Sequence, residues 1–339
     1  MRHLVLFAPL ALVLAVALGG TAQADRNGVV RFATLPSGPG HPEGIAADPA
    51  GNIYAATFGF SPPNFIYKFD RHGHVTATVT LATSVPLGMQ WGPDNKLYVD
   101  DFGNGDVLQF TPPITSASAP SRTYHVCTGG GSACALNAIT FDTAGLLYTS
   151  DSFGGRIFRF DPAGTPVVDS AFITDDSLKP GSHGFPPFGA NGLAFSAAGD
   201  LYVANTADDR ILKIAKGTTT PAAYVQSING VDGINFDPSG RLWACANQEN
   251  TLYLVDVSGA GEGLVADIRG SFDGVGRDGA PRGLLFPASI VFSHGSAFIT
   301  NTALDFRHHF VGEGPITRFT IARVPLGHGG DEDDGDNDN

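Results

Sequence analysis

The chain has 339 residues and a formal net charge of −13, from 20 basic and 33 acidic side chains. It has no basic stripe that could neutralise phosphate groups, which argues against a nucleic-acid-binding protein. Forty-four glycines, 23 prolines and only two methionines favour many short strands joined by tight turns over a helical fold.

The N-terminus predicts export. Two basic residues precede an apolar run over residues 4–18, and small residues lead to Ala24. This order is typical of a secretory signal peptide over residues 1–24. A retained membrane anchor is the alternative, although a spanning helix needs ~20 apolar residues. We therefore expect a secreted or periplasmic protein that makes no membrane contact after cleavage.

Six segments share one pattern and define the expected fold. Each has a polar or small residue, a short apolar strand, a glycine-containing turn and a second strand that opens with an apolar–aromatic pair. The segments are residues 43–54, 87–98, 137–148, 191–202, 232–243 and the weaker 288–298. A third strand is expected after each, at residues 66–69, 107–110, 157–160, 211–214, 252–255 and 316–319. With a fourth strand per unit, the pattern predicts an all-β, six-bladed β-propeller over residues 25–325.

The two ends of the chain complete this picture. The last repeat lacks a fourth strand, and residues 29–34 resemble the fourth strand of the first repeat. We expect them to finish the last blade, which would remove open sheet edges. Residues 326–339 hold six acidic side chains in the last nine positions and are expected to form a disordered acidic tail, with metal chelation as the alternative. We expect a monomer.

The three cysteines fall into two classes. Cys127 and Cys134 lie in one glycine-rich loop, and export favours a disulfide between them, although the sequence leaves other pairings open. Cys245 lies in a strand-like stretch and is expected to be a small buried apolar side chain.

The first position of each repeat predicts a metal site. The first strand of a propeller blade lines the central channel, so these six side chains should converge at one mouth. They are Glu43, Leu87, Asn137, Asn191, Asp232 and Ala288. Four carry oxygen donors, so we expect Glu43, Asn137, Asn191 and Asp232 to bind Ca²⁺ or another divalent cation. The alternative is that Asn and Asp before Gly only form turns, which does not explain Glu43 or Asn137.

The residues that follow the second strands should surround the same mouth. We expect the substrate rim to include side chains from these positions and His183 from a long loop. The predicted rim residues are Asp101, Asp151, His183, Asn205, Asn247 and Asn301. The alternative is that these loops are only surface connections.

The polar ring resembles the regucalcin/gluconolactonase family, over roughly residues 27–324, while the strand pattern is shared with NHL-type repeats. The resemblance rests on Glu43, Asn137, and the sequences that open with Asn191-Gly and Asp232-Gly. It implies a six-bladed propeller that binds a divalent metal, commonly calcium, and hydrolyses lactones. By position, Glu43, Asn191 and Asp232 would hold the metal and Asn137 would lie beside it or contact substrate.

The resemblance also implies that Asp232 is the candidate general base. Paraoxonases and relatives of strictosidine synthase share the architecture. One departure is that no residue matches the family's substrate-binding arginine in the second blade, where Leu87 and Met89 stand.

Three functional hypotheses follow. The first is a secreted, calcium-dependent hydrolase that acts on a small-molecule lactone or related ester. The alternative is a non-catalytic secreted binding propeller with a structural calcium, and the third is a synthase or lyase. The sequence contains neither a Gly-x-Ser-x-Gly nor a His-Glu-x-x-His motif, which argues against those serine and zinc hydrolases.

Overall fold

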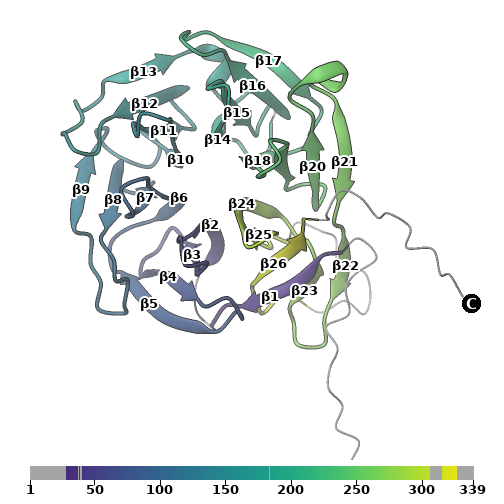
Figure 1. The fold of residues 1–339 in the computed structure, drawn as a ribbon. Helices are drawn as coiled ribbons and strands as arrows, with labels where there is room; N and C mark the ends of the chain where they lie inside the picture. Colours follow the sequence, from purple (N-terminus) through teal and green to yellow (C-terminus); the bar gives the residue numbers. More distant parts are fainter. Residues whose placement is uncertain (1–27, 37, 39, 183, 306–314, 327–339) are drawn as a thin grey trace, which may run out of the picture.

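The computed structural model describes residues 28–36, 38, 40–182, 184–305 and 315–326. Six four-stranded antiparallel sheets form a ring around a central axis (Figure 1), which confirms the predicted six-bladed β-propeller. The predicted signal peptide, residues 1–24, and almost all of the predicted acidic tail lie outside the described residues.

We number the blades from 1 to 6 in the order of their first strands. Blade 1 contains β2 (His41–Ala47), β3 (Ile53–Phe58), β4 (Asn64–Phe69) and β5 (Val75–Leu81). Blade 2 contains β6 (Pro86–Trp91), β7 (Leu97–Asp101), β8 (Asp106–Phe110) and β9 (Arg122–His125). Blade 3 contains β10 (Leu136–Phe141), β11 (Leu147–Asp151), β12 (Arg156–Phe160) and β13 (Ala171–Thr174).

Blade 4 contains β14 (Ala190–Phe195), β15 (Leu201–Asn205), β16 (Arg210–Ile214) and β17 (Pro221–Gln226). Blade 5 contains β18 (Val231–Phe236), β19 (Leu242–Ala246), β20 (Thr251–Val255) and β21 (Val265–Arg269). Blade 6 contains β24 (Pro287–Ser293), β25 (Ser296–Asn301), β26 (Thr320–Pro325) and β1 (Val30–Thr34). The connection between blades 5 and 6 adds a short hairpin, β22 (Phe272–Val275) and β23 (Pro281–Gly283).

The ring is closed by the N-terminal strand, as the sequence predicts. Strand β1 pairs antiparallel with β26 and completes blade 6 in the order β1-β26-β25-β24. The expected third strand of this blade, at residues 316–319, was placed too early. β26 begins at Thr320 because it pairs with β25, whose last residue, Asn301, lies opposite Thr320.

The repeat pattern has a clear structural cause in most blades. An aspartate in the connection that follows the first strand accepts a hydrogen bond from the aromatic side chain that opens the second strand. Tyr98 donates to Asp94 over 2.8 Å, and the Trp243 indole donates to Asp237 over 2.9 Å. Both aromatic side chains are fully buried, so the polar end of each obtains a partner while its ring fills the core between blades.

The cysteines behave as expected. Cys127 and Cys134 form a disulfide in the loop between β9 and β10, and Cys245 is free and buried in β19. Among the described residues, no helix has the length and apolar character needed to cross a membrane.

We expect the disulfide to stabilise the fold measurably. Changing Cys127 and Cys134 together to serine should lower the free energy of unfolding by about 2–3 kcal/mol, since the cross-link restricts a short loop of the unfolded chain. Urea unfolding of the oxidised protein and of the double variant measures this difference. The reduced wild type should coincide with the variant, and equal midpoints for oxidised and reduced protein would contradict the prediction.

Candidate functional site

The six predicted ring residues all lie on the innermost strands, β2, β6, β10, β14, β18 and β24, which surround the channel (Figure 1). Each of these strands has a break in its pairing register where the ring residue stands. In β2 the break lies between Pro42 and Ile45, and in β18 between Val231 and Ile234. Such β-bulges re-aim side chains, and here they occur at the same place in all six blades.

Close backbone packing explains the glycines that follow the ring residues. A Cβ atom on Gly192 would overlap the backbone carbonyl oxygen of Asp232, and one on Gly233 would overlap that of Ala288. Both glycines lie inside strands β14 and β18. Turn formation, the alternative from the sequence, therefore does not account for these Asn-Gly and Asp-Gly pairs.

The two asparagines of the ring are fixed by hydroxyl groups of their own blades. The side-chain nitrogen of Asn137 donates to Oγ of Ser152, and that of Asn191 donates to Oγ1 of Thr206, both over 3.0 Å. Ser152 in turn donates to the Ala190 carbonyl oxygen of the next blade over 2.7 Å. These bonds use the amide nitrogens and leave the carbonyl oxygens available as ligands.

The two carboxyl groups are also held by side chains, Asp232 by an amide of its own blade and Glu43 by a hydroxyl group of blade 6. Oδ2 of Asp232 accepts a hydrogen bond from the Asn247 amide over 3.2 Å. The Thr302 hydroxyl lies 3.2 Å from Oε2 of Glu43 and 2.6 Å from the Pro42 carbonyl oxygen. His41 supports this contact, because its Nδ1 lies 2.7 Å from the Thr302 carbonyl oxygen.

The surroundings of the ring disfavour the simultaneous ionisation of its two carboxyl groups. Burial raises the pKa of Asp232 to about 7, although hydrogen bonds from Asn247 and Asn191 act in the opposite direction. Burial and the nearby charge of Asp232 raise the pKa of Glu43 well above its usual range. Burial, with the charges of both carboxylates, also raises the pKa of the Cys245 thiol, so this cysteine is not an activated nucleophile.

These features fit a hard dication. Two carboxylates and two amide carbonyls are oxygen ligands, and two positive charges would relieve the repulsion between Glu43 and Asp232. Oδ1 of Asn247, beside Asp232, is buried without a hydrogen-bond partner in the described chain. The described part of the chain contains no group of three or more His, Cys, Asp or Glu side chains that could hold a metal, so the asparagines are essential to any such site.

Most of the predicted rim residues hold loops in place. Asp101 accepts from the Val85 backbone over 2.9 Å, and Asp151 accepts from the Ala135 backbone over 2.8 Å. Both side chains are buried, and each bonds the connection that enters the first strand of its own blade. Their contact with substrate stays a prediction.

The remaining rim residues divide into three cases. Asn205 and Asn301 also bond entrance connections, donating to the carbonyl oxygens of Ser177 and Gly283 over 2.8 and 2.9 Å. Asn247 differs, because Val231 pairs with Ala246 and Asn247 is one position later, where it reaches Asp232. His183 lies outside the described residues.

Sequence reasoning did not recognise the residues that bond or pack against the ring as one set, although it named Asn247 as a rim residue. They occupy the position directly after the second strand in each blade, except blade 1, where β3 includes it. In chain order they are Phe58, Phe102, Ser152, Thr206, Asn247 and Thr302. Aligning this column beside the ring column would have shown a hydroxyl or amide in four blades and phenylalanine in two.

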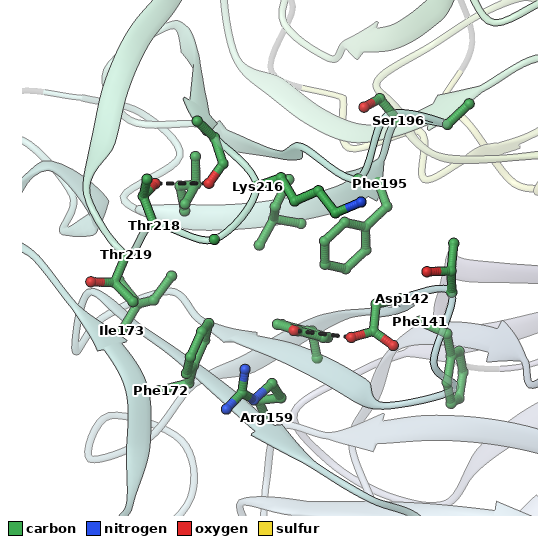
Figure 2. A pocket seen from close by; sticks show the side chains of 18 residues that line it. Phe141, Asp142, Arg159, Phe172, Ile173, Phe195, Ser196, Lys216, Thr218 and Thr219 are labelled. Carbon is green, nitrogen blue, oxygen red and sulfur yellow. Dashed lines mark hydrogen bonds between the residues drawn. The ribbon is translucent and has the colours of Figure 1, made fainter.

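A cavity of about 760 Å³ lies elsewhere, between blades 3 and 4 at the opposite end of the channel strands (Figure 2). Its Asp142 accepts a hydrogen bond from Tyr148, as the equivalent aspartates do in other blades, and Arg159 lies 3.7 Å from the Phe172 ring centre. These polar groups serve the repeated blade contacts. We therefore assign the chemistry to the ring, although the channel cavity beneath it has only about 70 Å³.

The sequence matches no protein-family model and no curated protein sequence. Solved structures do match. A gluconolactonase from Xanthomonas campestris has a TM-score of 0.60 and 15% identity, covering 90% of this chain and 92% of its own. Virginiamycin B lyase from Staphylococcus aureus gives 0.55 and 13%, with 86% and 98% covered. The aldose sugar dehydrogenase of Streptomyces coelicolor, solved with bound PQQ, gives 0.53 and 15%, with 89% and 99% covered.

At these identities the similarity shows the fold alone. The three proteins have different activities by name, so the fold does not select among a hydrolase, a lyase and an oxidoreductase. The resemblance to gluconolactonases that the sequence predicts is confirmed at the level of the propeller fold.

The raised pKa values predict a pH-dependent stability for the metal-free protein. A carboxyl that keeps its proton in the folded state but loses it near pH 4 on unfolding costs about 1.4 kcal/mol per pH unit above pH 4, until its folded pKa is reached. For Asp232 this range ends at about pH 7. Asp232→Asn, which stays neutral, should therefore match the wild type near pH 4 and become more stable than it by pH 7.5.

Urea unfolding in chelator between pH 4 and 8 measures this difference. Asp176→Asn is the matched control, since Asp176 is exposed and, among the described residues, its side chain bonds Lys179 alone. Lys179 lowers the pKa of Asp176, so any pH effect of this control has the opposite sign. Parallel curves for the wild type and Asp232→Asn would show that the ring carboxyls ionise freely.

Proposed function

We propose that the protein is a divalent-metal-dependent hydrolase, with calcium as the metal, that acts on a lactone or related ester. The observation that supports this most strongly is the pair of carboxyl groups, half-buried Glu43 and buried Asp232, whose surroundings raise both pKa values, in one ring with the amides of Asn137 and Asn191. Removing two carboxylates from water costs free energy, and a bound cation would offset that cost and their mutual repulsion.

The four ring residues would hold the cation through their side-chain oxygens. When bound, such a cation polarises a carbonyl group and lowers the pKa of a water molecule. The hydroxyl groups of Ser152, Thr206 and Thr302 contact the side chains of the ligands and would fix their orientation. Residues that bond the ligands of a metal do this in metal sites generally.

Asp232 is the candidate general base. Its Oδ2 is bonded to Asn247, so Oδ1 is the atom that would take a proton from the attacking water. Water then adds to the carbonyl carbon, the ring C–O bond breaks, and the same proton passes to the departing ring oxygen, giving a hydroxy acid. A bound dication would favour the ionised form of this carboxyl, which is the form that can accept a proton.

A non-catalytic binding propeller with structural calcium is the second candidate. The observation in its favour is that Leu87 and Met89, both buried, stand in blade 2 where lactonases of the resembled family carry a substrate-binding arginine. The same substitution makes a sugar lactone a poor choice of substrate. We also infer export, because the disulfide is suited to an oxidising compartment.

We expect calcium to stabilise the protein and to support turnover. At 100 times its Kd, calcium should add about 2.7 kcal/mol to the free energy of unfolding. Hydrolysis of a panel of γ- and δ-lactones should require calcium and should fall at least 100-fold in Asp232→Asn. Thermal melting and pH-stat titration, each with and without chelator, measure the two effects.

The exposed variant Asp176→Asn should behave as the wild type in both assays. Stabilisation by calcium with no turnover on any lactone would favour the binding propeller. Loss of both calcium effects only in Asp232→Asn supports the ring, whereas no calcium effect in the wild type overturns the metal assignment.

A further inference from the structure

A continuous row of phenylalanine side chains crosses the channel mouth on the side of blades 1 to 3. The ring centres of Phe60 and Phe58 are 4.8 Å apart, and those of Phe60 and Phe102 are 6.1 Å apart. Phe102 lies 6.2 Å from Phe153, which stacks on Phe188 at 5.3 Å. We call these five residues the phenylalanine row.

The row runs from solvent into the protein. Phe60 is 71% exposed, Phe58, Phe153 and Phe188 are half-buried, and Phe102 is buried. A single exposed apolar side chain is ordinary on a protein surface, but an exposed one that continues a packed aromatic row forms an apolar patch.

The row also reaches the polar ring. Leu87, the ring residue between Glu43 and Asn137, packs in one apolar cluster with Phe58, Phe102, Phe153 and Phe188. Phe58 and Phe102 occupy the column that carries Ser152, Thr206, Asn247 and Thr302 in the other blades, so phenylalanine replaces the hydrogen-bonding group in two adjacent blades. The mouth therefore has oxygen donors in blades 1, 3, 4 and 5, and an apolar wall centred on Leu87 of blade 2.

We propose that the phenylalanine row is the subsite for an alkyl or aryl substituent of the lactone or ester, an inference that rests on the proposed hydrolase. Apolar substituents gain by leaving water for such a wall. The hydroxyl groups of a sugar lactone would lose water there without gaining partners from the phenyl rings. A flat protein or membrane surface could cover Phe60 but would not use the contact of the row with Leu87 inside the mouth.

Two δ-lactones that differ by one apolar chain test the subsite. They are δ-valerolactone, which is unsubstituted, and δ-decalactone, which carries a pentyl group beside the ring oxygen. A fully buried methylene is worth about fourfold, so burial of two pentyl carbons should raise the kcat/KM of the wild type on δ-decalactone about tenfold, once the uncatalysed rates of the two lactones are divided out. Phe60→Ser should lower this value about fivefold, through KM, and leave δ-valerolactone unchanged.

Matched variants separate the subsite from general damage. Phe60→Leu keeps an apolar side chain and should retain most of the δ-decalactone activity. Leu264→Ser removes a side chain that is 61% exposed at the opposite end of the blades, between β20 and β21. It should leave kcat/KM unchanged on both lactones. Each variant is compared with the wild type on the same lactone, so differences in intrinsic lactone reactivity cancel.

A binding measurement separates this inference from the proposed reaction. 2-Pentylcyclopentanone cannot be hydrolysed, and its binding by calorimetry should weaken about fivefold in Phe60→Ser. If no lactone is turned over but this Phe60-dependent binding is found, the hydrolase is wrong and the subsite stands. If δ-decalactone is turned over and its kcat/KM is the same in Phe60→Ser as in the wild type, the subsite is overturned and the hydrolase is left intact.

Discussion

Glu43 and Asp232 come close enough for their charges to interact because the first strands of neighbouring blades approach too closely for side chains at four positions. Gly44, Gly88, Gly192 and Gly233 each face the backbone carbonyl of the next blade's ring residue. The bulges in the same strands turn the preceding residues to the channel mouth. This backbone packing brings together two carboxyl groups that are remote in sequence. Their surroundings disfavour the ionised form of both.

The ring is held from outside by a second layer of hydrogen bonds. Ser152, Thr206 and Asn247 bond the ring residue of their own blade, whereas Thr302 reaches across the closure of the propeller to Glu43 in blade 1. That last contact depends on blade 6, which is complete only when β1 pairs with β26. The first strand of the described chain therefore supports the site as well as the fold.

Repetition made much of this predictable. Because the same strand pattern recurs six times, the blade count, the inner strands and the closure by residues 29–34 follow from the sequence, and aligned first positions gave the ring. The third strand of blade 6 was misplaced because its start depends on pairing with β25, a non-local contact. The set of positions directly after the second strands was not recognised because two of its six members, Phe58 and Phe102, are apolar. The shift in register at Asn247 was not predictable because it depends on how β18 pairs with β19.

The rim illustrates another limit. Asp101 and Asp151 stand at the mouth in the expected register, but their side chains bond backbone groups of the entrance connections. Composition and spacing place a residue at one end of a strand, whereas the direction of its side chain depends on which backbone groups lack partners nearby. The same limit explains why the apolar wall beside the ring was not foreseen from isolated phenylalanines.

A crystal structure of the protein grown with calcium tests the central claim most directly. The account predicts one cation at the channel mouth, bound by carboxylate oxygens of Glu43 and Asp232 and by amide oxygens from Asn137 and Asn191, with water completing its shell. A ring that holds only water at saturating calcium, with its carboxyl groups bonded to each other, would contradict it.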